Sequence, residues 1–319
     1  MVKIFVSFLI FSYGSIVTGY LTKRILPDME NLSKPIANAV LSFLIPIIIL
    51  NSFWSLDLGE EKLFLLPFIN ICVLSLTIIP AILISKGLKL TRRETGSFVS
   101  TSMFSNVGIT LGGFICYLLF GDRGLFLSAL YNAFFVPYFY IIGFLIMRII
   151  KSDISNPGIK KAVVDLFRNP TSAISIITMI IGVILNIFQL QRPALLNTIA
   201  TKYITYLSVC LNSFAIGLGL NIRKSFNYIK HGFLVSLIKF LYNPAVTYVL
   251  ISISGLSKLE DNVPARVVFV LSFMPSAILS VTLSKIFDMN DDLANTAWLL
   301  SNMSIIIILP GLAYLMKLI

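Results

Sequence analysis

The residue types that enzymes use most often for catalysis are scarce in this sequence and poorly placed to act together. The single histidine, His231, stands beside Lys230 at the expected entrance of an apolar stretch. Neither a two-histidine zinc site nor a histidine-based triad can be built from one histidine. The Asp and Glu residues lie at the ends of apolar stretches or between them, as Asp57 and Asp288 do. We therefore expect no enzymatic activity, no metal site and no cofactor.

Polar and helix-breaking residues do occur at the centres of two apolar stretches. Residues 105–113 read SNVGITLGG, and Pro275 is surrounded by serines. Proline removes a backbone donor, and glycine lowers helix stability by about 1 kcal/mol relative to alanine. Unwinding at both points would expose helix N-termini, whose partial positive charge attracts anions; kinked but continuous helices are the alternative. The candidate ligand-contacting residues here are Ser105, Asn106, Gly108, Thr110, Pro275 and Ser276.

Lys239 is the basic residue that lies well inside an apolar stretch, LIKFLYNPAV. Its ammonium group either extends to the lipid headgroups or faces the protein interior, where an anionic ligand would compensate its charge. Asparagine offers both a donor and an acceptor, so each intramembrane asparagine either contacts a ligand or bridges two helices. The candidates of this kind are Asn51, Asn132, Asn212 and Asn302, with Asn243 a weaker one.

The elements that must position these residues are membrane-spanning helices. The chain has 319 residues, of which 57% are apolar and 12% charged, and its mean hydropathy is +0.92. Such a composition is foreign to soluble domains, and the absence of period-2 alternation argues against a barrel. Stretches of about 18 or more apolar residues predict spanning helices. Ten are predicted, at about 4–21, 36–54, 63–85, 96–120, 125–148, 172–190, 199–220, 232–253, 265–287 and 293–316.

The net charge of +11 follows the membrane topology. Lys and Arg concentrate in the connections after the odd-numbered predicted spans, which places those connections in the cytoplasm. We therefore expect a multi-pass protein of the cell membrane with both termini on the extracytoplasmic side. The basic surplus needs no nucleic-acid partner.

Short motifs recur in order along the two halves of the chain. The tetrapeptide LNSF occurs at 50–53 and 211–214, and SMFSNVG in the first half corresponds to SFMPSA in the second. A five-span unit that is repeated must enter the membrane the second time from the opposite side. We therefore predict an inverted repeat, with residues 1–150 and 172–319 as the two units. Residues 151–171 would join them on the cytoplasmic side, as a short amphipathic surface helix or a solvated linker.

The sequence resembles the auxin efflux carrier family, which includes the plant PIN carriers and bacterial transporters of malonate and related acids. The resemblance is carried by FMPSAILSVTLSKIFDMNDDLANTAWLLSNMSIIIILP, by LIKFLYNPAV and by the RNP of residues 168–170. It implies a scaffold domain of spans 1, 2, 6 and 7, a transport domain of spans 3–5 and 8–10, and broken helices that cross in spans 4 and 9. It also implies an elevator-like movement and a homodimer formed through the scaffold. One departure is that span 4 lacks the proline common at the first crossing.

The leading hypothesis is a carrier of a small organic anion, such as an auxin-like carboxylate or a dicarboxylate, in the lipid bilayer. A sodium-coupled symporter of the bile-acid type is an alternative, although this span 9 offers Ser and Thr rather than the Glu and Gln common as sodium ligands in that type. A membrane receptor or channel that retains the carrier fold is an alternative of another class.

Overall fold

The computed structural model describes residues 2–55, 61–151, 164, 168, 170–193, 196, 198–220, 227–259 and 262–318. These residues are almost entirely helical. Within them, six helical stretches are long and apolar enough to cross a membrane: Phe5–Ile25, Pro27–Ser55, Lys62–Gly87, Ile109–Lys151, Ile229–Ser254 and Asp291–Leu312. Shorter apolar helical stretches are Ala173–Ile187 and Val263–Ser272. The predicted class of helical membrane protein agrees with the structure, whereas the number of ten spans stays a prediction. Most of the predicted linker, 151–171, lies outside the described residues.

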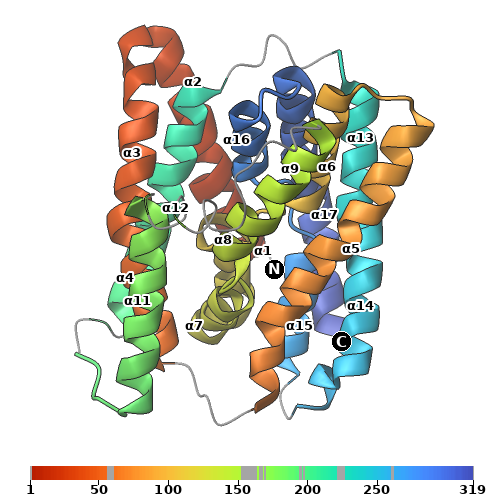
Figure 1. Ribbon diagram of the computed structural model, residues 1–319. Coiled ribbons are helices and arrows are strands. Elements are labelled where there is room, and N and C mark those ends of the chain that lie inside the picture. The colour runs from red at the N-terminus through yellow and green to blue at the C-terminus, as the bar shows by residue number, and fades with distance from the viewer. Residues whose placement is uncertain are drawn as a thin grey trace.

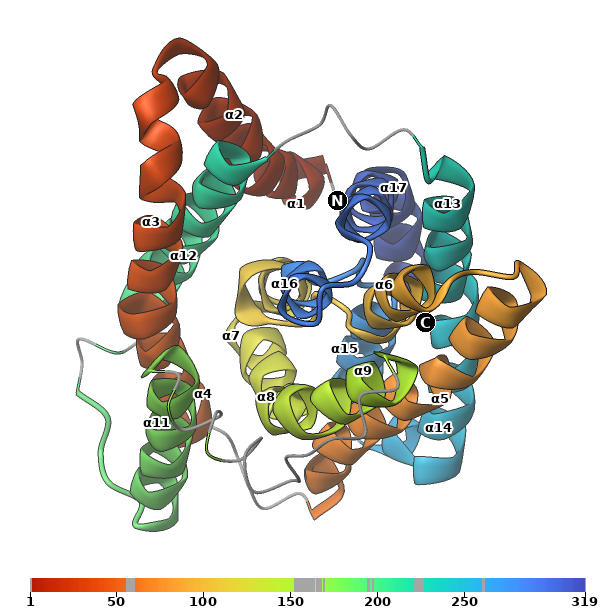
Figure 2. The same ribbon diagram turned by 45° about the horizontal axis from the view of Figure 1, so that its top comes forward.

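One set of helices, which we call the flanking bundle, lies mostly at the left of Figures 1 and 2. It is formed by residues 2–55 and 170–220. Its elements are α1 (Val2–Phe8), η1 (Leu9–Gly14), α2 (Ser15–Ile25), η2 (Pro27–Leu32), α3 (Ser33–Ala39), η3 (Val40–Leu44), α4 (Ile45–Ser55), α11 (Pro170–Ile187) and α12 (Thr198–Gly219).

The remaining helices form what we call the crossing bundle, residues 61–151 and 227–318. Its first part contains η4 (Glu61–Phe64), α5 (Leu65–Gly87), α6 (Arg92–Met103), η5 (Ile109–Gly113), α7 (Phe114–Tyr131), α8 (Phe135–Tyr138), η6 (Phe139–Gly143) and α9 (Phe144–Lys151). Its second part contains α13 (Ile229–Leu237), η8 (Ile238–Tyr242), α14 (Asn243–Ser254), η9 (Leu256–Lys258), α15 (Val263–Ser272), α16 (Ile278–Ile286) and α17 (Asp291–Leu318). Within this bundle α16 packs against α6, and α15 packs against α7.

Small residues bring α2 and α12 of the flanking bundle together. A Cβ atom at Gly217 would lie 2.1 Å from the carbonyl oxygen of Ile16, and one at Gly19 would lie 2.3 Å from the carbonyl oxygen of Phe214. Such contacts are typical of membrane helices, where small residues let backbones approach. Gly14 makes no comparable contact, since the nearest atom to its would-be Cβ is the carbonyl oxygen of Leu9 in the same span, at 3.6 Å.

One predicted span is not a single helix. The sequence predicts a continuous helix over 125–148, but residues 132–134 form a turn between α7 and α8. Pro137 explains the break, because proline has no N–H and its ring clashes with the carbonyl four residues earlier, at Ala133. The turn places Asn132 at the C-terminus of α7, where its backbone N–H still donates to the carbonyl of Ser128.

Each bundle is held together internally by polar contacts. In the flanking bundle, Ser33 donates to the carbonyl of Ala215 over 2.7 Å. In the crossing bundle, Thr77 donates to the Asn243 side chain over 2.8 Å. Between the bundles the contacts are mainly apolar, as in the cluster where Ile216 and Leu220 pack against Val281, Ala294 and Trp298.

Candidate functional site

The site is built where two interrupted helices meet. α6 ends at Met103 and η5 begins at Ile109, while α15 ends at Ser272 and α16 begins at Ile278. Both interruptions agree with the prediction from sequence. The two unwound segments lie antiparallel, with Ser105 opposite Ser276.

Backbone hydrogen bonds join the two unwound segments. The N–H of Asn106 donates to the carbonyl of Pro275 over 2.7 Å, and the N–H of Ala277 donates to the carbonyl of Phe104 over 2.9 Å. Unwound backbone inside a membrane protein must find such partners, because unpaired backbone groups are costly away from water. The paired segments, residues 104–108 and 273–277, are called the crossover below.

Two glycines after the break on the α6 side are closely surrounded. A Cβ atom at Gly112 would lie 2.8 Å from the side chain of Leu271, and one at Gly113 would lie 2.9 Å from the hydroxyl of Ser128. The turn after the crossover is therefore packed too closely for a larger residue. On the other side Ser301 accepts from the N–H of Ser276 over 3.1 Å, which fixes the crossover against α17.

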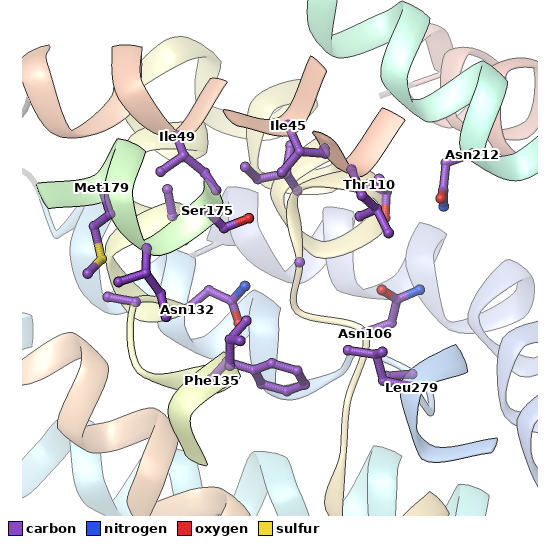
Figure 3. Close-up of a pocket in the computed structure, with 18 of the residues that line it drawn as sticks. Ile45, Ile49, Asn106, Thr110, Asn132, Phe135, Ser175, Met179, Asn212 and Leu279 are labelled. Carbon is purple, nitrogen blue, oxygen red and sulfur yellow. The ribbon is translucent and has the colours of Figure 1, made fainter. Parts of the chain in front are cut away.

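A cavity of about 240 Å³ lies between the crossover and the flanking bundle. Its polar lining comes from both bundles: Figure 3 shows Asn106 and Thr110 on one side, Asn132 and Ser175 on the other, and Asn212 beyond Thr110. Most of the remaining lining is apolar. The residues of this part are Leu41, Ile45, Ile49, Phe53, Ile109, Ala129, Ala133, Phe135, Val136, Ile176, Met179, Ala277, Ile278 and Leu279.

Two helix N-termini border this cavity. The first residues of η5, with Gly108 before them, and the first residues of α16, with Ala277 before them, contribute to its lining. Neither Gly108 nor Ala277 provides a side-chain cap. The first N–H groups of a helix have no partner within it and carry partial positive charge. The end of the cavity at the crossover therefore suits an anionic group.

Lys239 contacts the crossover through Ser105 without lining the cavity itself. Its side chain is 0% exposed, and its Nζ donates to the hydroxyl of Ser105 over 2.9 Å. Lys239 does not line the cavity, but Ser105 does. Because the Ser105 oxygen accepts from the Lys239 amine, its own hydrogen can still be donated. Lys239 is thus linked to the cavity through one hydroxyl.

The structure brings most of the residues predicted from sequence to one place. Ser105, Asn106, Gly108, Thr110, Asn132 and Asn212 line the cavity. Pro275 and Ser276 are in the crossover but outside the lining; Ser276 is buried and donates to the carbonyl of Thr101 over 2.8 Å. Their role seen in the structure is to shape the crossover.

Asn51 and Asn302 bridge helices in the structure and lie outside the lining of the cavity. Asn51 donates to Thr201 over 2.6 Å and accepts from Arg192 over 3.3 Å, within the flanking bundle. Asn302 donates to the carbonyl of Ser276 over 3.1 Å. The sequence symmetry between Asn51 and Asn212 therefore does not extend to the cavity, because Asn51 is turned toward α12 and its neighbouring loop.

Several lining residues gave no signal in the sequence. Ser175 and Met179 lie one turn apart on α11, and Phe135 follows the turn at residues 132–134. Ordinary residues of apolar helices become site residues only when helices pack together. A second cavity of about 120 Å³ adjoins the first, since Leu41, Val136, Ser175 and Leu279 line both. It extends the space toward Tyr140 and Thr171.

A polar cluster joins the start of α6, at the end away from the crossover, to the residues just before α13 and α17. Thr91 and Glu94 form a reciprocal cap at the start of α6, and Tyr228 donates to Glu94 over 3.1 Å. Asn290, before α17, donates to Tyr228 over 2.7 Å. Partial burial alone would raise the pKa of Glu94, but the hydrogen bonds from Thr91 and Tyr228 outweigh it and hold this pKa below its ordinary value. Glu94 is thus a carboxylate at neutral pH, as the cap requires.

No protein-family model matches this chain, and no curated protein matches its sequence. The cavity, the crossover and Lys239 therefore carry the functional interpretation.

Proposed function

We propose that this protein is a membrane carrier of small organic anions. The observation that carries the proposal is the crossover itself, where two interrupted helices present their N-termini to one cavity. Broken helices with ends directed at a central ligand are characteristic of secondary transporters. The resemblance to the auxin efflux carrier family points to the same function.

The lining of the cavity supports a carboxylate with an apolar body as cargo. None of the described lining residues is Asp or Glu, so the cavity offers no repulsion to an anion. Helix N-termini and the Ser105 hydroxyl, polarised by Lys239, are donors for the carboxylate. Ile45, Ile49 and Phe135 supply apolar surface for the rest of the molecule. Because the donors gather at one end of the cavity and the rest of its lining is mainly apolar, an auxin-like monocarboxylate fits it better than a dicarboxylate.

In the proposed mechanism, ten spans form two inverted five-helix repeats, and the crossing bundle moves as an elevator against the flanking bundle. Support comes from the polar contacts within each bundle and the apolar contacts between them. Apolar surfaces slide past each other without leaving buried polar groups unpaired. We further propose a homodimer through the flanking bundle, in the cell membrane, with both termini outside.

The test is flux of radiolabelled carboxylates into proteoliposomes that contain the purified protein, with sodium gradient and membrane potential varied separately. We expect saturable uptake that does not require sodium. Asn106→Ala should lower uptake about tenfold or more, because a hydrogen bond to a charged group contributes about 1.5–3 kcal/mol. The matched control is Asn227→Ala, on an exposed turn, which should leave uptake unchanged.

The other outcomes separate the alternatives. Strict dependence on sodium would favour a symporter of the bile-acid type. Binding of a carboxylate without net flux would favour a receptor, and conductance far above the turnover of a carrier would favour a channel. If no carboxylate is bound or moved, the proposal is wrong.

A further inference from the structure

We propose that Tyr13 is a positioning residue that locks the flanking bundle to the crossover in one of the two positions of the transport cycle. The inference rests on the proposed function, because it requires bundles that move against each other. It concerns a residue that has no part in the cavity lining.

Consider the side-chain hydrogen bonds in which both partners are described residues. Among them, the bond from the Tyr13 hydroxyl is the one that joins the two bundles. Tyr13 lies in η1, a π-helical turn of the first membrane helix, and its ring packs edge to face on Phe8 with ring centroids 5.4 Å apart. Its hydroxyl donates to the main-chain carbonyl of Asn302 in α17. Figure 2 shows the N-terminal helices extending from the flanking bundle to α17. π-helical turns within α-helices are frequent at functional positions.

Asn302 transmits this contact to the crossover. Its side-chain amide donates to the carbonyl of Ser276 over 3.1 Å, and its neighbour Ser301 accepts from the N–H of Ser276 over 3.1 Å. Both polar groups of the Ser276 backbone are thus held by adjacent residues of α17. Tyr13 of the flanking bundle therefore contacts the same residue that shapes the crossover.

The surroundings make this hydrogen bond specific to one of the two positions that the bundles take in the proposed transport cycle. The neighbouring contacts between the bundles are apolar and tolerate sliding, whereas a hydrogen bond is lost beyond about 3.5 Å. The Asn302 carbonyl lies inside a helix and can keep its intrahelical partner when Tyr13 leaves. The contact is therefore stabilising where it forms and inexpensive to release in each cycle.

The experiment compares Tyr13→Phe with the unchanged protein by spin-label distance measurements. Labels are attached to Lys34→Cys on α3 and Lys230→Cys on α13, two exposed positions in different bundles, in a background without Cys72, Cys116 and Cys210. In proteoliposomes, the distance that matches this structure should lose population in Tyr13→Phe, with the ratio of the two populations changing about two- to tenfold, the range expected for one neutral hydrogen bond. Carboxylate turnover should change with it.

The matched control is Tyr20→Phe, whose hydroxyl accepts from Arg24 within the flanking bundle; it should leave the ratio unchanged. An unaltered ratio in Tyr13→Phe, in a protein that does transport carboxylates, would overturn the lock and leave the carrier function standing. Failure of the unchanged protein to transport any carboxylate would instead remove the proposed function.

Discussion

Lys239 is a buried amine whose partner is a hydroxyl group rather than a carboxylate. The ion pairs between described residues, Lys23–Glu30 and Arg93–Asp288, lie elsewhere, the first partly exposed and the second largely exposed. A buried amine without a counterion is costly, so we expect this residue to lower the stability of the empty protein. An anionic cargo at the other side of Ser105 would offset that cost. Stability and transport should therefore respond to Lys239 in opposite directions.

Lys239→Met tests this opposition directly. The variant removes the charge and nearly keeps the volume, so the thermal midpoint in detergent should stay or rise. Carboxylate uptake should fall about 10- to 100-fold, as expected when a charge-assisted hydrogen bond of about 1.5–3 kcal/mol is lost. Lys230→Met, at an exposed position of α13, is the control. Undiminished uptake in Lys239→Met would show that the lysine has only a structural part.

At the level of helices, the molecule depends on backbones that approach closely. Gly19 and Gly217 let α2 and α12 touch along their main chains, and Gly182 brings α11 to the carbonyl of Leu50 in α4 within 2.9 Å of a would-be Cβ atom. These contacts hold the flanking bundle as one body. The glycines of the turn after the crossover have the same character, since Gly112 and Gly113 are closely surrounded.

Gly217→Ala should destabilise the flanking bundle by about 1–3 kcal/mol, the usual cost of overpacking, because its Cβ would meet the Ile16 carbonyl at 2.1 Å. The measurement is the thermal midpoint of the purified protein. Gly311→Ala in α17 is the control, since nothing lies within 4 Å of its Cβ; it should be neutral or stabilise by up to about 1 kcal/mol through helix propensity. Equal midpoints for the two variants would refute the close approach.

At the scale of the whole molecule, Tyr206 of α12 lies at the boundary between the two bundles. Its ring lies 4.5 Å from Phe11 in the flanking bundle and 5.2 Å from Phe114 in the crossing bundle, measured between centroids. Both contacts are edge-to-face aromatic pairs of ordinary strength. The first pair lies within one bundle, and the second joins the two bundles.

A pair of cross-links uses this difference. Tyr206→Cys with Phe114→Cys, bridged by a short bifunctional thiol reagent, should stop carboxylate transport because it joins two bundles that slide past each other in the proposed mechanism. Tyr206→Cys with Phe11→Cys, bridged in the same way, should retain transport. Each variant before bridging is its own reference. Continued transport with the first pair bridged would contradict the elevator mechanism.

The helical membrane class and the two helix breaks that form the crossover could be predicted from the amino-acid sequence, whereas the break at residues 132–134 was not predicted. Its apolar stretches need internally satisfied backbone, which makes helices the solution, and Pro275 and the glycines of residues 108–113 lower helix stability locally. The sequence also pointed to Ser105, Asn106, Thr110, Asn132 and Asn212, because polar groups are conspicuous in an apolar chain.

Which polar residues face the cavity depends on tertiary packing and could not be predicted in this way. Asn51 and Asn212 stand in the same LNSF motif, yet Asn51 is used by Thr201 and Arg192 while Asn212 lines the cavity. The periodicity of a helical sequence predicts which face of the helix a residue occupies. It does not predict which other helix packs against that face, because this depends on how helices distant in sequence pack together. For the same reason, the position of Lys239 beneath Ser105 and the contact of Tyr13 with α17 have no counterpart in any local pattern.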